Sequence, residues 1–163
     1  MSFHVHNRLK AFFDYKGNKA FASKGHVTEA DQKFILFDAY YASLMVGFKR
    51  RKPGSESDLE SGYFIDHFPE PYLTSREYIV GLLIDSELRH LEGDRYSKRD
   101  IERTIVKLLA PNSATRLSKE GMKAANLYAS HGFEVIEDLF KIPPSSVPNF
   151  FTRYNEFWAT GKF

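Results

Sequence analysis

The chain has 163 residues, of which 42% are hydrophobic, 15% aromatic and 27% charged, with a net charge of +2 and a pI near 8.7. This length suffices for one domain with a sizeable core, and the many aromatic residues exclude an intrinsically disordered chain. The absence of cysteine excludes disulfides and cysteine-ligated zinc or iron–sulfur sites. We therefore expect a single domain over residues 1–163.

Three capping boxes predict the starts of helices. In each box, a Ser or Thr precedes an acidic residue by three positions, which satisfies free amide groups and favours the helix dipole. The boxes are Thr28…Asp31, Thr74…Glu77 and Ser97…Asp100. Because apolar residues at helical spacing follow each box, we predict helices over about 29–48, 75–91 and 98–110.

The apolar patterns indicate how these helices are buried. On the first helix, steps of three and four place five apolar residues on one helix face: Phe34, Phe37, Tyr41, Leu44 and Phe48. The second begins with Tyr78–Ile84, which is apolar all round, and we expect it to be the most buried helix, ended by Gly93. In the third, Ile101, Ile105 and Leu108 are expected to face inward.

The rest of the chain predicts a short helix near the N-terminus, which Asn7 could cap and which would run through Tyr15 before Gly17, and three further helical segments after residue 117. One follows Ser118 and ends at a left-handed C-cap on Gly132, a short one covers 133–141, and the last has Pro148 in its first turn. The segments 62–66 and 114–117 are candidates for short strands, and 49–62 is expected to be an exposed charged loop. The fold class is therefore all-α, a bundle of about six helices with at most one or two short strands.

No standard catalytic constellation is present, and we expect neither a cofactor nor a metal. The chain has no nucleophile elbow, phosphate loop or dinucleotide-binding glycine motif. Glu87 and His90 have the spacing of di-iron bundles, but the motif occurs once, so a solvated helix face is the favoured interpretation. His4 and His6 could share a metal site, and the favoured alternative is a disordered N-terminus.

Basic residues form two candidate regions for contact with nucleic acid. On the helix over 98–110, the basic residues are spaced by four and share one stripe, and further cations follow it. The stripe and its extension comprise Arg99, Arg103, Lys107, Arg116, Lys119 and Lys123. The second region is the run Lys49, Arg50, Arg51 and Lys52. This run could stabilise a helix C-terminus, contact phosphates, or be neutralised by the acidic residues that follow it.

The segment Ala114–Ala125 resembles the place where the wing of winged-helix DNA-binding proteins enters the next helix. The resemblance covers about a dozen residues and implies that the helix over 98–110 is the recognition helix. It departs from that family because only residues 110–115 separate Leu109 from Arg116, too few for a normal two-stranded wing. An ordinary pair of amphipathic helices is the favoured alternative.

Aromatic residues dominate the C-terminal helix and could anchor a protein partner. The candidate anchors are Phe150, Tyr154, Phe157 and Trp158. The favoured alternative is a terminal helix docked on the core, because aromatic rings dominate cores.

Three functional hypotheses follow. The first is a non-enzymatic accessory or regulatory protein that contacts the phosphates of DNA or RNA. The second is a subunit of a larger protein complex or homo-oligomer, and the third, ranked last, is a metal-dependent enzyme. The N-terminus lacks a signal peptide and no apolar run reaches the roughly 20 residues of a membrane span, so we expect a cytoplasmic protein without a membrane partner.

Overall fold

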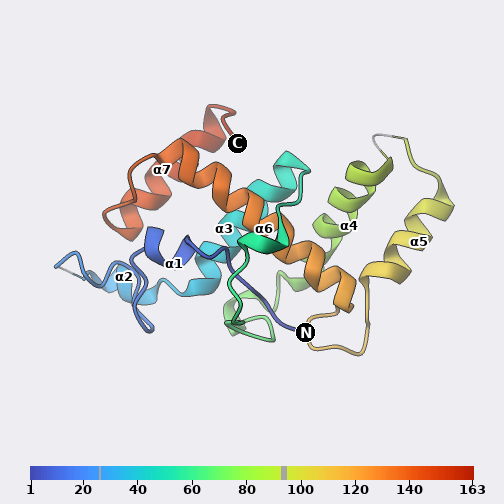
Figure 1. Ribbon diagram of the computed structural model, residues 1–163, viewed down its shortest axis with the longest axis horizontal. Coiled ribbons are helices and arrows are strands. Elements are labelled where there is room, and N and C mark those ends of the chain that lie inside the picture. The colour runs from blue at the N-terminus through green and yellow to red at the C-terminus, as the bar shows by residue number, and fades with distance from the viewer. Residues whose placement is uncertain (26, 93–94) are drawn as a thin grey trace.

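Helices make up the regular secondary structure of the residues that the computed structural model describes, 1–25, 27–92 and 95–163 (Figure 1). The α-helices are α1 (Leu9–Phe12), α2 (Glu29–Lys33), α3 (Leu36–Arg50), α4 (Arg76–Glu92), α5 (Lys98–Leu108), α6 (Lys119–Phe140) and α7 (Val147–Ala159). Two 3₁₀ helices, η1 (Glu56–Asp58) and η2 (Glu70–Tyr72), lie in the segment between α3 and α4. Both strand candidates form only isolated bridges, Phe3–Ile65 and Leu109–Leu117. The predicted all-α fold is confirmed.

The crossing of α3 and α6 forms the centre of the molecule (Figure 1). A Cβ atom added to Gly132 would lie 1.8 Å from the carbonyl oxygen of Ser43, and one added to Gly47 would lie 2.0 Å from that of Tyr128. The two backbones can approach this closely only where glycine removes the side chain. The prediction that Gly132 ends a helix is therefore wrong: α6 continues through it to Phe140, and no separate helix covers 133–141.

The predicted helix over 29–48 is broken into α2 and α3. Phe34 and Ile35 have extended backbone, and the carboxylate of Asp38 accepts a 2.7 Å hydrogen bond from the Ile35 amide, which starts a new helix. The apolar spacing continues across the break because Phe34 is buried in its extended conformation. The sequence pattern therefore conceals a local interruption that a side-chain carboxylate stabilises.

The capping boxes have different outcomes. The boxes at Thr28 and Ser97 form as predicted, with reciprocal side-chain and backbone hydrogen bonds. The box at Thr74 is wrong, because α4 begins at Arg76 and the carboxylate of Glu77 pairs with Arg76 at 2.9 Å. Ser118 caps α6 and Pro148 lies in the first turn of α7, as predicted.

The predictions for the burial of α4 and α5 need correction. Tyr78 is 68% exposed, so α4 is not the central helix. Gly93, which was expected to end this helix, lies outside the described residues. On α5, Thr104 and Leu108 are buried, whereas Ile105 is exposed. The central position belongs to α3 and α6 because their glycines let the two backbones touch.

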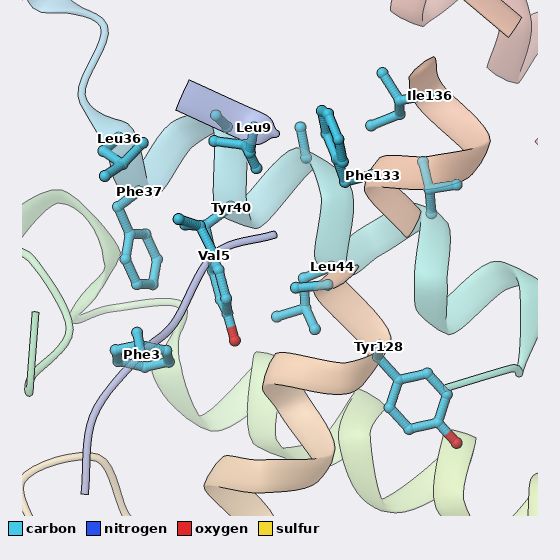
Figure 2. Packing of buried hydrophobic residues seen from close by; sticks show 14 of the residues in the cluster. Phe3, Val5, Leu9, Leu36, Phe37, Tyr40, Leu44, Tyr128, Phe133 and Ile136 are labelled. Atoms are coloured by element: carbon cyan, nitrogen blue, oxygen red, sulfur yellow. The ribbon is translucent and has the colours of Figure 1, made fainter. Parts of the chain in front are cut away.

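The N-terminal segment is part of the core, which overturns the expectation of a disordered terminus (Figure 2). Phe3 is 1% exposed and meets the rings of Phe37 and Tyr40, each at a centroid distance of 5.2 Å. Its amide donates to the carbonyl of Ile65 at 2.8 Å. The Glu60 amide in turn donates to the carbonyl of Val5 at 2.8 Å, which joins the charged segment to the N-terminus.

Candidate nucleic-acid interface

The basic stripe on α5 and its extension into α6 are exposed but mostly paired with acidic side chains. The N–O distances are 3.1 Å from Arg103 to Asp100, 3.9 Å from Lys107 to Glu87 and 3.7 Å from Arg116 to Glu77. Lys123 pairs with Glu56. Arg99 and Lys119 are also exposed. The acidic partners offset much of the positive potential that the sequence pattern indicates for this face.

The segment between α5 and α6 does not form a wing. Residues 109–117, all of them described, make a turn closed by the single bridge between Leu109 and Leu117. The Ala110 amide donates to the carbonyl of Arg116 at 2.9 Å, and Ser118 then caps α6. The resemblance to winged-helix proteins therefore lacks its defining hairpin.

The basic segment Lys49–Lys52 lies at the C-terminus of α3, and the residues of this segment are exposed. Arg51 adopts the left-handed conformation, with φ of 53°, and its amide donates to the carbonyl of Gly47 at 2.9 Å. Positive charge at this position also stabilises the helix dipole, as the sequence predicts.

The acidic residues that follow the basic segment are directed elsewhere. Glu56 pairs with Lys123 on α6, and Glu60 pairs with Lys10 on α1 at 2.6 Å. The guanidinium of Arg50 donates to the carbonyl of Lys162 at 2.7 Å, which places the residues after α7 beside the basic segment. Two carboxylates that could neutralise the basic segment, those of Glu56 and Glu60, therefore pair with lysines on other helices.

A groove lies between α3, α4 and α7, which we call the α3–α7 groove. Its volume is about 540 Å³, which is in the range of small-ligand pockets. Its walls include Tyr41, Met45, Phe48, Leu82, Tyr154 and Trp158, and its polar residues are Lys49, Arg51, Asp85, Ser86 and Asn155. The fold thus brings together the basic segment and the aromatic terminal helix, which the sequence assigns to different partners.

Two of the four predicted aromatic anchors are in the core. Phe150 is 0% exposed and packs against Phe13 at a centroid distance of 5.0 Å, and Phe157 is also buried. Their assignment as partner-binding residues is therefore wrong, because the helix docks through them. Tyr154 is partly buried and donates its hydroxyl to the carbonyl of Ala42 at 2.9 Å, and burial raises its pKa to about 12. Trp158 remains 36% exposed.

Glu87 is buried, which corrects the expectation that it lies on a solvated face. Its carboxylate accepts a 3.1 Å hydrogen bond from the hydroxyl of Tyr128 and lies 3.9 Å from the ammonium of Lys107. Burial, followed by the nearby Glu87 charge, raises the pKa of Tyr128. His90 is exposed and lines a cleft of about 350 Å³ together with Glu87. These contacts connect α4 to α5 and α6.

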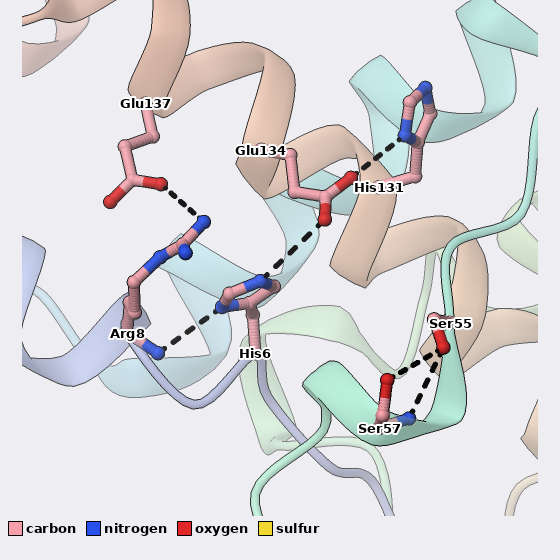
Figure 3. A network of polar contacts seen from close by, with 7 residues as sticks. All are labelled: His6, Arg8, Ser55, Ser57, His131, Glu134 and Glu137. Atoms are coloured by element: carbon pink, nitrogen blue, oxygen red, sulfur yellow. Dashed lines mark hydrogen bonds and ion pairs between the residues drawn. The ribbon is translucent and has the colours of Figure 1, made fainter.

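The N-terminal histidines point into different environments, and among the described residues no three His, Asp or Glu side chains are placed to hold a metal ion. Figure 3 shows the buried imidazole of His6 between Arg8 and Glu134. Its Nδ1 accepts the Arg8 amide at 3.1 Å, and its Nε2 lies 3.9 Å from a carboxylate oxygen of Glu134. His4 instead contacts the carbonyl of Glu60 at 3.2 Å. The His6 network fastens the N-terminus to α6.

The α3–α7 groove brings exposed cations and an exposed aromatic ring together in one concave surface.

No helix in the described part of the chain is long and apolar enough to cross a membrane. Comparisons of the chain with protein families, with curated proteins and with solved structures find no match.

Proposed function

We propose that the protein is a non-enzymatic accessory or regulatory protein that binds nucleic acid through the basic segment Lys49–Lys52 and the α3–α7 groove. The observation that carries this proposal is the presence of Trp158, Lys49 and Arg51 in the lining of one groove. Cations attract phosphates without regard to sequence, and exposed aromatic rings stack on bases. A surface that combines the two suits nucleic acid better than it suits a purely apolar partner.

The stripe on α5 and α6 has a secondary role in this proposal. Its lysines and arginines are exposed but share their charge with Asp100, Glu87, Glu77 and Glu56. Such pairs contribute less to phosphate binding because each contact with a phosphate competes with an existing carboxylate. We therefore expect variants of Lys49 and Lys52 to affect binding more than variants in the stripe.

Fluorescence anisotropy of a labelled oligonucleotide tests the proposal at about 50 and 200 mM salt. The variant Lys49→Gln with Lys52→Gln should weaken binding and reduce the slope of log affinity against log salt by about 0.7 per lysine for a single strand. Lys16→Gln with Lys19→Gln is the matched control, since it removes the same charge from an exposed turn before α2. An absence of binding at low salt, or an equal loss in the control, would refute the proposal.

A protein partner is the second candidate, because apolar side chains predominate in the walls of the groove. A side chain of a partner protein could insert into the groove and contact Trp158, because tryptophan is common among the residues that contribute most to binding at interfaces. Light scattering of the purified protein and identification of co-purifying proteins test this candidate. It predicts an assembly that Trp158→Ala dissociates, whereas a monomer without a co-purifying partner would count against it.

A further inference from the structure

We infer that the α3–α7 groove accepts one unstacked nucleobase against Trp158, so that the protein binds single-stranded nucleic acid in preference to a duplex. This inference rests on the proposed function and adds the form of nucleic acid that the site selects. It depends on three features of the groove: its size, the surroundings of the indole ring, and the polar groups at its rim.

The size of the groove fits a base and its sugar. Its volume of about 540 Å³ lies within the roughly 300–1,000 Å³ of pockets that hold small ligands. Tyr41, Met45 and Leu82 are partly buried and supply an apolar wall for the face of a base. A double helix cannot enter such a space, because its bases are paired and stacked inside the duplex.

The indole of Trp158 is available for stacking. Tyr154 and Phe163 meet it at interplanar angles of 67° and 65°, with centroid distances of 6.2 and 5.4 Å. These are edge-to-face contacts, which fix the orientation of the indole. Among the ring contacts of the described residues, none places a parallel ring on it. With 36% of the residue exposed, the parallel position can be taken by a base.

The polar residues of the groove suit the two ends of a nucleotide. Lys49 supplies positive charge for the phosphate, and Asn155 supplies an amide that can donate to or accept from a base edge. Asp85 is engaged by Arg89 at 2.9 Å, so its charge is partly compensated. A duplex can reach the cations but must unpair and unstack a base to reach Trp158, which costs a few kcal/mol. This cost is the source of the inferred selectivity.

Intrinsic fluorescence can report on this site alone, because Trp158 is the single tryptophan of the chain. Three probes are titrated at low salt: a single-stranded oligonucleotide of about 12 nucleotides, within the usual range of site sizes, its blunt duplex, and inorganic polyphosphate. The single strand should bind most tightly and quench the emission of Trp158. The duplex and polyphosphate should bind more weakly and change the emission little.

The outcomes separate the inference from the proposed function. If the duplex or polyphosphate binds as tightly as the single strand, or if the single strand binds without quenching, the inference is overturned and the proposed function stands. If none of the three probes binds at low salt, the proposed function fails and the inference fails with it.

Variants on α7 provide the second measurement. Trp158→Leu should weaken single-strand binding by roughly 5- to 150-fold in anisotropy, while duplex binding changes less than about twofold. Trp158→Phe keeps an aromatic ring and should restore most of the affinity. Phe151→Leu is the matched control, since Phe151 is 40% exposed on the same helix but packs against Phe34, outside the groove. Unchanged single-strand affinity in folded Trp158→Leu would overturn the inference.

Discussion

The substitution Gly132→Ala tests whether the crossing of α3 and α6 determines the fold. A methyl group at this position would lie 1.8 Å from the carbonyl oxygen of Ser43 and 2.6 Å from the amide nitrogen of Gly47. Both neighbours are backbone atoms of α3, so no side-chain rotation can relieve the overlap. To bring the first contact from 1.8 Å to even 3.0 Å, the backbones must separate locally by about 1.2 Å.

The expected cost follows from two opposing effects. Overpacking of a buried contact destabilises proteins by about 1–3 kcal/mol, and backbone-to-backbone overlap belongs at the upper end of that range. Alanine favours a helix over glycine by about 1 kcal/mol. We therefore expect Gly132→Ala to lower the free energy of unfolding by about 2 kcal/mol.

Gly81→Ala is the matched control for this prediction. Gly81 is exposed on α4, and a Cβ atom there would meet nothing within 4 Å, so only the gain in helix propensity remains. We expect this variant to be more stable than the natural chain by about 0.5–1 kcal/mol. Urea titrations and thermal melts followed by circular dichroism measure both variants, which should differ in Tm by roughly 5–12 °C. Equal stability of the two variants would refute the close crossing.

Two further predictions concern buried polar groups. Burial, with the positive charge of Arg8, lowers the pKa of His6 below 6.5 in the folded protein. As the pH falls, the imidazole of the unfolded chain is therefore protonated at a higher pH than that of the folded chain. The free energy of unfolding should therefore fall as the pH drops from about 7 to 5, and the slope should diminish in His6→Asn; an unchanged slope in that variant contradicts the assignment. Burial alone would raise the pKa of Asp31, but hydrogen bonds from Val147 and Thr28 outweigh it and lower the pKa. In urea titrations, Asp31→Ala should cost about 2–4 kcal/mol, and a loss below about 1 kcal/mol would show that these bonds contribute little.

The capping residues in the sequence predict helix starts because the hydrogen bonds involved join residues only a few positions apart. A capping box acts over three residues, and two of the three boxes form as predicted. Ser118 and Pro148 also mark helix starts correctly. The third box is wrong because α4 begins at Arg76, so that its first turn does not use Thr74. Such errors of one or two residues at helix ends do not change the fold class.

The candidate site depended on contacts that no local pattern records. Lys49 and Trp158 were assigned to different partners, and only the packing of α7 beside α3 places them in one groove. Glu87 matched a surface pattern, yet its burial follows from Tyr128 on another helix. Conversely, the regular spacing of cations on α5 predicted a positive face that acidic residues from α4 and η1 partly neutralise.

The sequence by itself determined that this chain forms helices and where most of them begin, because capping and apolar periodicity act within a few residues. The tertiary structure alone decided that α6 passes through Gly132. This outcome depends on atoms brought together from distant parts of the chain, because the Ser43 carbonyl lies against Gly132. Such tertiary contacts contribute more free energy than the helix propensities of individual residues, so packing determines where helices end and which residues are exposed.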